Sequence, residues 1–152
     1  MDSSEFLHQH HSEIVDAAQG ALARLGGPHY QSADQGEVRR RIEVLFDHVA
    51  DSLASHDLGS LVSYAESVAE ERFNGGYDLS EVQTAFNALE ESIWTRAVAT
   101  LEPGQLAETL GLVSTALGCG KDALARKYVS LATRTHAPSL DLRALFSGSE
   151  GT

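Results

Sequence analysis

The chain has 152 residues, a length typical of one domain and sufficient to bury a core without disulfides or metal ions. Its 11 basic and 22 acidic residues give a formal net charge of -11, which disfavours nucleic acid and anionic lipid as partners. The single cysteine cannot form an intramolecular disulfide, no secretion signal is recognisable, and no apolar run approaches the roughly 20 residues of a membrane span. We therefore expect a cytoplasmic protein that contacts neither membrane nor nucleic acid.

Two amphipathic helices are predicted in the first third of the chain. The first covers residues 3–25, where apolar residues recur mainly at helical spacing, and the glycines and proline of residues 26–28 end it. The second covers residue 34 to about residue 55 and begins with a capping-box signature, Asp34 followed by Glu37. Its apolar stripe consists of Val38, Ile42, Leu45, Val49 and Leu53.

Paired glycines separate a third helix from a fourth. The third is predicted from residue 58 to residue 73, and the sequence Asn74-Gly75-Gly76 stops it. Asp78 and Glu81 then form a second capping-box signature, which starts a fourth helix that runs toward residue 101. Because the cap explains the local sequence, we interpret the glycines as a helix stop rather than as a ligand-binding loop.

A fifth helix is predicted from Pro103 to about Arg134. Gly118 and Gly120, on either side of Cys119, favour either a kink or close packing against another helix, and the cysteine itself is typical of a small buried apolar residue. The close-packing alternative would use a strip of small residues near one face of the helix, namely Gly111, Ser114, Thr115 and Gly118.

The pattern as a whole predicts an all-α fold, a single-domain bundle of about five helices over residues 3–134. Residues 135–152 are expected to form a C-terminal tail that is partly disordered, with one short docking turn. That turn would contain Leu140, Leu142, Leu145 and Phe146.

Histidines are the first candidates for chemistry. His8, His10 and His11 lie close together near the start, but without a recognised metal motif we interpret them as solvated, and no metal site is expected. His48 and His56 are single helical histidines, each of which could ligate haem iron, although such residues are more often hydrogen-bonded and partly buried. Haem is therefore the alternative interpretation, and we expect no cofactor.

No catalytic constellation is recognisable, so an enzyme is not expected. The acidic pairs Glu70-Glu71 and Glu90-Glu91 place adjacent carboxylates about 100° apart on a helix, which is typical of solvated faces. Trp94 and Phe86 are expected to be core anchors or to line a ligand cavity. They are pocket or interface candidates together with Gly111 and Gly118.

The segment from residue 71 to residue 94 carries a family resemblance. A helix ends in Glu71-Arg72-Phe73, a short glycine-bearing loop follows, a new helix starts at Leu79-Ser80-Glu81-Val82, and Ile93-Trp94 lies further along it. This arrangement resembles the N-terminal domain of RsbRD-type proteins, stressosome-associated co-antagonists of the RsbT kinase, and the likeness extends from about residue 6 to residue 134.

The resemblance implies a helical bundle related to the globin fold that usually lacks haem, often pairs as a dimer, and passes a signal through its last helix. Nothing after Arg134 is long enough for a STAS output domain, so we expect a free-standing sensory or adaptor domain or a fragment of a larger protein. Our leading hypothesis is a non-catalytic regulatory domain in bacterial stress signalling that binds protein partners and forms a homodimer through its fourth or fifth helix. The alternative is a small-molecule or haem sensor.

Overall fold

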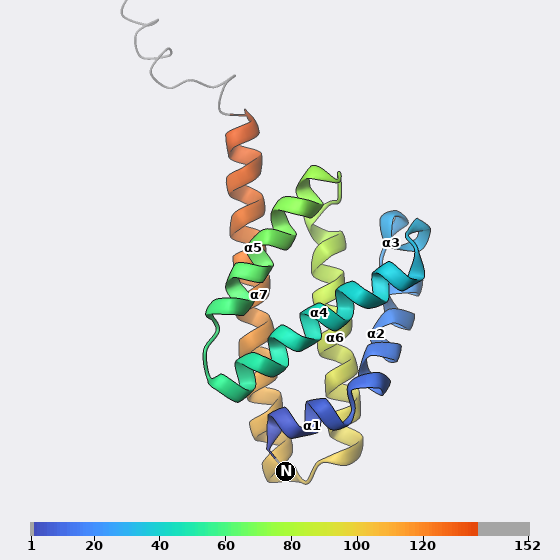
Figure 1. Cartoon of the computed structure of the whole chain (residues 1–152), viewed down its shortest axis with the longest axis vertical. Helices are drawn as coiled ribbons and strands as arrows, with labels where there is room; N and C mark the ends of the chain where they lie inside the picture. Colours follow the sequence, from blue (N-terminus) through green and yellow to red (C-terminus); the bar gives the residue numbers. More distant parts are fainter. Residues whose placement is uncertain (1, 137–152) are drawn as a thin grey trace, which may run out of the picture.

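Seven α-helices follow one another in the computed structural model, which describes residues 2–136 (Figure 1). Their bounds are α1 Ser3–Gln9, α2 His11–Leu25, α3 Pro28–Ser32, α4 Gln35–Ser55, α5 Gly59–Asn74, α6 Leu79–Thr100 and α7 Pro103–His136. The described residues contain no strand, and the predicted all-α class is confirmed. The expected number of about five helices was too low, and the globin-like arrangement stays a prediction.

The two longest helices, α6 and α7, run side by side along the long axis of the molecule (Figure 1). Helix α2 packs against α6, α5 packs against α7, and α4 crosses in front of both long helices and contacts each of them. Helix α7 continues past the ends of α5 and α6. One layer of the bundle is therefore formed by α6 and α7, and the shorter helices cover one side of it.

The apolar stripes predicted from the sequence form the core. All five stripe residues of α4 are buried, and Val82, Phe86, Leu89 and Ile93 of α6 are buried as well. Burying a large apolar side chain contributes about 1.5–3 kcal/mol relative to leaving it exposed. These stripes therefore supply the main force that holds the helices together. No helix in residues 2–136 has the length and apolar character needed to cross a membrane.

The predicted first helix is divided in two at His10. This residue has φ -107° and ψ 19°, ends α1 and precedes α2. Helix α1 contacts α4 and α7, and the Ser3 hydroxyl forms a 2.8 Å hydrogen bond with that of Thr109 in α7. Helix α2 packs instead on α6. A straight helix could not reach both partners, so the break is a tertiary effect that periodicity does not reveal.

A short helix that the sequence analysis missed, α3, follows α2. Gly27 has a positive φ of 87°, which favours glycine, and Pro28 occupies the first turn of α3. The sequence Gly26 to Pro28 therefore ends one helix, as predicted, and also begins another. Helix α3 carries the buried side chain of Tyr30 into the bundle.

Both predicted helix caps are present, although they differ in detail. Asp34 accepts a hydrogen bond from the Glu37 amide at 3.0 Å, but the Glu37 carboxylate contacts Arg40 and Arg41 rather than completing a capping box. Asp78 and Glu81 form the complete box at the start of α6. The glycines before Asp78 are a helix stop, as predicted, since α5 ends at Asn74.

Helix α7 is continuous over its described 34 residues, so Gly118 and Gly120 do not break it. A Cβ atom added at Gly120 would lie 3.2 Å from Cε2 of Phe86, which indicates close packing of α7 on α6 at this glycine. A Cβ atom at Gly118 would have no neighbour within 4 Å. The predicted docking turn lies in residues 137–152, outside the described residues, and the division at residue 134 stays a prediction.

Glu81 joins α3 to the start of α6. Its carboxylate accepts a hydrogen bond from the Asp78 amide at 3.0 Å and lies 2.9 Å from Nδ1 of His29. Burial raises the pKa of Glu81, but the hydrogen bonds from Asp78 and His29 outweigh this effect and hold the pKa below its ordinary value of 4.5. The ionised carboxylate is therefore the form that stabilises this junction.

Replacing Glu81 by alanine is expected to lower the free energy of unfolding at neutral pH by about 1–2 kcal/mol, because a helix cap and the link to α3 are lost. Since the folded-state pKa is depressed, the stabilisation is present above pH 4.5 and is lost as the pH falls through the folded-state pKa. Urea unfolding at neutral pH and at successively lower pH measures both effects.

The exposed Glu66 of α5 supplies the matched control, because Glu66→Ala removes a carboxylate from a helix surface. This variant is expected to unfold at nearly the same urea concentration as the parent protein. A stability difference between Glu81→Ala and the parent that does not change on acidification would contradict the assigned role of the ionised carboxylate.

Candidate functional site

Phe86 and Trp94 lie about 80° apart around α6, Phe86 at the buried side and Trp94 at the edge that reaches the surface. Phe86 is 2 % exposed and lines an internal cavity, as one of the two expectations for it required. Trp94 was expected to be a core anchor or to line a ligand cavity, and it is 42 % exposed. The structure does not bring the two residues together in one site, because Trp94 does not line the cavity beside Phe86.

Trp94 belongs to an exposed surface that α6 and α7 share and that consists mainly of small or uncharged residues, with Glu91 beside Trp94. Both helices contribute to this outer face at helical spacing, and a Cβ atom added at Gly111 or Gly118 would have no neighbour within 4 Å. The predicted strip of small residues is thus not covered by any described part of the chain. We define the outer face by its exposed members, Asn87, Trp94, Val98, Ala107, Gly111, Thr115 and Gly118.

Two acidic side chains, Glu90 and Glu91, lie beside Trp94 in a shallow surface depression. Glu90, predicted to be solvated, pairs with Lys121 at 3.1 Å and accepts a hydrogen bond from the Ser114 hydroxyl at 3.0 Å, whereas Glu91 is exposed as predicted. Lys121 also donates to the side chain of Asn87 at 2.9 Å. These contacts fix the antiparallel register of α6 and α7 and neutralise Glu90.

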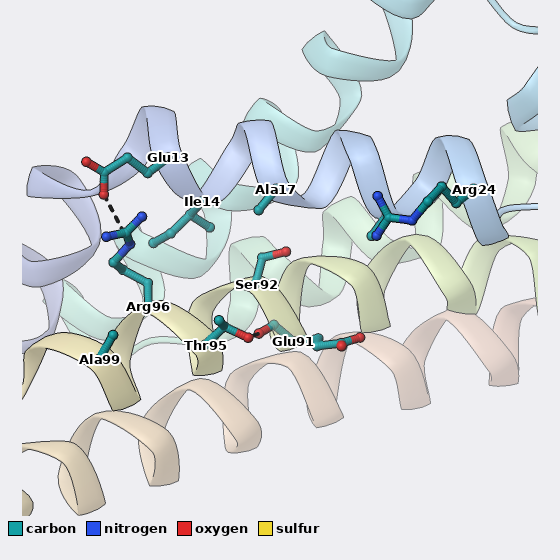
Figure 2. A pocket seen from close by; sticks show the side chains of 10 residues that line it. Glu13, Ile14, Ala17, Arg24, Glu91, Ser92, Thr95, Arg96 and Ala99 are labelled. Carbon is teal, nitrogen blue, oxygen red and sulfur yellow. Dashed lines mark hydrogen bonds and ion pairs between the residues drawn. The ribbon is translucent and has the colours of Figure 1, made fainter.

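An open groove of about 370 Å³ lies between α2 and α6 (Figure 2). Glu13 and Arg96 form an ion pair of 3.1 Å at one end, and Arg24 lies at the other end. Two acidic and two basic side chains line the groove, so its charges balance. This arrangement provides no net field that would select a charged ligand.

The hydroxyl groups in the groove are not arranged for nucleophilic catalysis. Ser92 donates to the carbonyl of Ala88 at 2.8 Å, and Thr95 donates to the carbonyl of Glu91 at 2.9 Å. A serine nucleophile needs a base that accepts its proton, and each hydroxyl proton here is engaged by the helix itself. The groove therefore does not form a catalytic site of that kind.

The cavity beside Phe86 is smaller and more enclosed by the chain than the groove. It has a volume of about 30 Å³ and is formed by side chains of α2, α3, α4, α5 and α6. Tyr30, Arg41, Tyr64 and Arg72 are its polar lining residues. Burial raises the pKa of Tyr30 and of Tyr64, and Arg72 opposes the increase in both. Both phenols therefore stay protonated at neutral pH and are hydrogen-bond donors.

The candidate haem ligands do not lie at this cavity. His48 stacks on Tyr64 with ring centroids 4.5 Å apart, and its Nδ1 atom is 3.4 Å from the Ser60 hydroxyl. His56 has a positive φ of 59° and ends α4 in an exposed turn. Neither histidine lines the cavity, and a space of about 30 Å³ is far below the 300–1,000 Å³ of ordinary ligand pockets. The residues of this cavity do not fit a haem.

His10 and His11 are less solvated than predicted, whereas His8 is exposed as predicted. His10 packs against Phe6 and contacts Glu13 at 3.0 Å, whereas the ring of His11 meets the ring of Phe46 edge-on. Within residues 2–136 no group of three or more His, Cys, Asp or Glu side chains is placed to hold a metal ion. The lone Cys119 is partly buried.

Sequence reasoning missed the most unusual residue of the bundle, Arg72. It is only 5 % exposed, yet it was treated as part of a helix end. A signal was present, because Arg72 follows Val68 by four residues and Ala65 by seven, which places it on the buried stripe of α5. Tyr30 was missed together with α3.

Comparison with known proteins gave one family match. The model of the RsbT co-antagonist protein rsbRD N-terminal domain matches residues 10–141. Neither the curated proteins nor the solved structures gave a match. The family match covers the helices from α2 to α7, and with α6 it includes both Phe86 and Trp94.

Addition of haemin to the purified protein is expected to give no Soret band that depends on His48 or His56, because neither side chain lines the internal cavity. Absorption spectra of the parent protein, His48→Ala and His56→Ala test this expectation. A sharp Soret band in the parent protein that disappears in either variant would overturn it and restore the haem interpretation.

Proposed function

Because the chain belongs to the family of RsbT co-antagonist rsbRD N-terminal domains, we propose that it is a non-catalytic regulatory domain that acts through protein contacts in bacterial stress signalling. The family name identifies antagonism of RsbT as the process to which such domains contribute. The proposed setting is the cytoplasm, in agreement with the acidic composition and the single cysteine.

The outer face of α6 and α7 is the observation that carries this proposal. Trp94 and Val98 expose 42 % and 61 % of their surface there, beside a strip of small residues on α7. Aromatic residues are enriched at the centres of protein interfaces, and small residues allow two helices to approach closely. We assign this face to contact with another protein.

The proposed occupant of the outer face is a second copy of the same chain. With a net charge of -11, two copies repel each other wherever their acidic surfaces meet. The residues that define the outer face are uncharged, and the adjacent Glu90 is paired with Lys121, so the exposed Glu91 is the acidic side chain beside Trp94 that two approaching copies have to accommodate. A two-fold arrangement would also place each Trp94 against the glycines of the partner.

Helix α7 is the proposed route by which such pairing affects other proteins. It carries half of the outer face and continues past the ends of α5 and α6 (Figure 1). A helix of 34 residues spans about 51 Å and moves as one body. A change in how two copies pack would therefore shift the far end of α7.

The single tryptophan makes this pairing directly measurable. The parent protein is expected to sediment as a dimer at high concentration, and the emission of Trp94 is expected to move to shorter wavelength in parallel as the ring leaves water. Gly111→Arg keeps the tryptophan but places a charge within the strip of small residues of the face, and it should raise the dissociation constant about tenfold or more.

Ser63→Arg is the matched control. Ser63 is also exposed, and it lies on α5, which contributes no residue to the outer face. This variant should dimerise like the parent protein, and circular dichroism should show the same helicity for all three proteins. A parent protein that stays monomeric, or equal weakening by both arginines, would refute the proposed interface.

A further inference from the structure

The guanidinium group of Arg72 is buried without a complete set of acceptors. Its Nη1 atom pairs with Glu71 at 2.7 Å, but Glu71 is 69 % exposed, and the Nε atom has no hydrogen-bond partner among the described residues. An arginine side chain stays charged in proteins. Leaving a buried charged donor without an acceptor lowers the stability of the folded state. We therefore expect the Nε atom to have a hydrogen-bond partner that is not among the described residues.

The cavity beside Phe86 is the space that such a partner can occupy. Arg72 lines this cavity, and the volume of about 30 Å³ exceeds the 10–15 Å³ that one water molecule requires. Most of the lining is apolar and comes from α2, α4, α5 and α6, and these side chains contain no hydrogen-bond acceptor. The hydroxyl of Tyr30 is already hydrogen-bonded to Arg72, yet the Nε atom still has no partner, so an occupant of the cavity is the remaining source of an acceptor for it.

The charges around the cavity favour a negative occupant. Arg41 and Arg72 both line it, and no aspartate or glutamate is among its described lining residues. Arg41 contacts Glu37 through Nε at 3.3 Å and donates from Nη1 to the hydroxyl of Tyr77 at 3.2 Å. The acidic partners of both arginines thus lie outside the cavity lining.

We propose that this cavity binds one small monovalent anion, of the size of chloride or formate, which accepts a hydrogen bond from Nε of Arg72. A water molecule would supply an acceptor but no charge, and the small volume of about 30 Å³ favours an anion of few atoms over sulfate or a larger carboxylate. The protonated hydroxyls of Tyr30 and Tyr64, which also line the cavity, are further donors of suitable chemistry.

Anion binding at this position would join parts of the chain that are distant in sequence. The polar lining residues come from α3, α4 and α5, and Phe86 adds α6. A ligand that binds only the folded state stabilises it in proportion to the logarithm of its concentration above the dissociation constant. The folded state is therefore expected to depend on small anions and not on ionic strength alone.

Thermal unfolding at constant ionic strength tests the proposal, with chloride, bromide or formate replacing gluconate, which is too large for the cavity. For the parent protein, the midpoint should rise by about 4 °C for each tenfold increase of the small anion above its dissociation constant. Arg72→Met should abolish this dependence, because it removes the donor and the buried charge. Arg126→Met removes an exposed arginine of α7 and should keep the full dependence.

Crystals of the parent protein soaked in bromide provide a test that does not depend on the variant folding. An anomalous peak within hydrogen-bonding reach of Nε of Arg72 is the expected result. A water molecule alone at this position, or equal midpoints in gluconate and chloride, would overturn the proposal. Neither experiment involves the outer face, so failure here leaves the proposed dimer interface untouched.

Discussion

The junction at Glu81 connects the short helix α3 to the start of the long helix α6. One carboxylate caps the start of α6 and contacts His29 of α3, which is 52 residues earlier in the chain. The ring of His29 stacks on Tyr77 at 4.3 Å, and Tyr77 in turn lies 5.6 Å from the guanidinium carbon of Arg72. The position of α3, and with it the wall of the internal cavity, depends on this contact. A helix of five residues is marginal by itself, so this contact and the buried side chain of Tyr30 together hold α3 in place.

Helix α6 separates two surfaces with different chemistry. Its inner side brings Phe86 to a small cavity with two arginines and two tyrosines, and its outer side exposes Trp94 beside an uncharged strip of α7. The hydrophobic core between these surfaces is continuous, since Leu89 and Ile93 are fully buried. An anion inside and a partner outside would therefore act on the same rigid helix.

The extent to which the sequence predicted this structure differs between long and short elements. The helices α4 to α7 carry strong apolar stripes, and their expected bounds agree with the observed ones within a few residues. The division at His10 and the short helix α3 were not foreseen, because each results from contacts with distant segments, Thr109 in one case and Glu81 in the other. The spacing of apolar and polar residues within one segment does not show which distant residues that segment will contact.

For the candidate site, sequence alone determined the residue types and the side of each helix on which they lie. It determined an all-α fold, the caps at Asp34 and Asp78, and a strip of small residues near one face of the last helix at Gly111 and Gly118, because helical spacing and cap chemistry are local properties. Only the tertiary structure decided that Trp94 faces outward and that Arg72 lies beside a cavity. Both outcomes depend on which helices cover α5 and α6, and this is set by packing across the whole bundle.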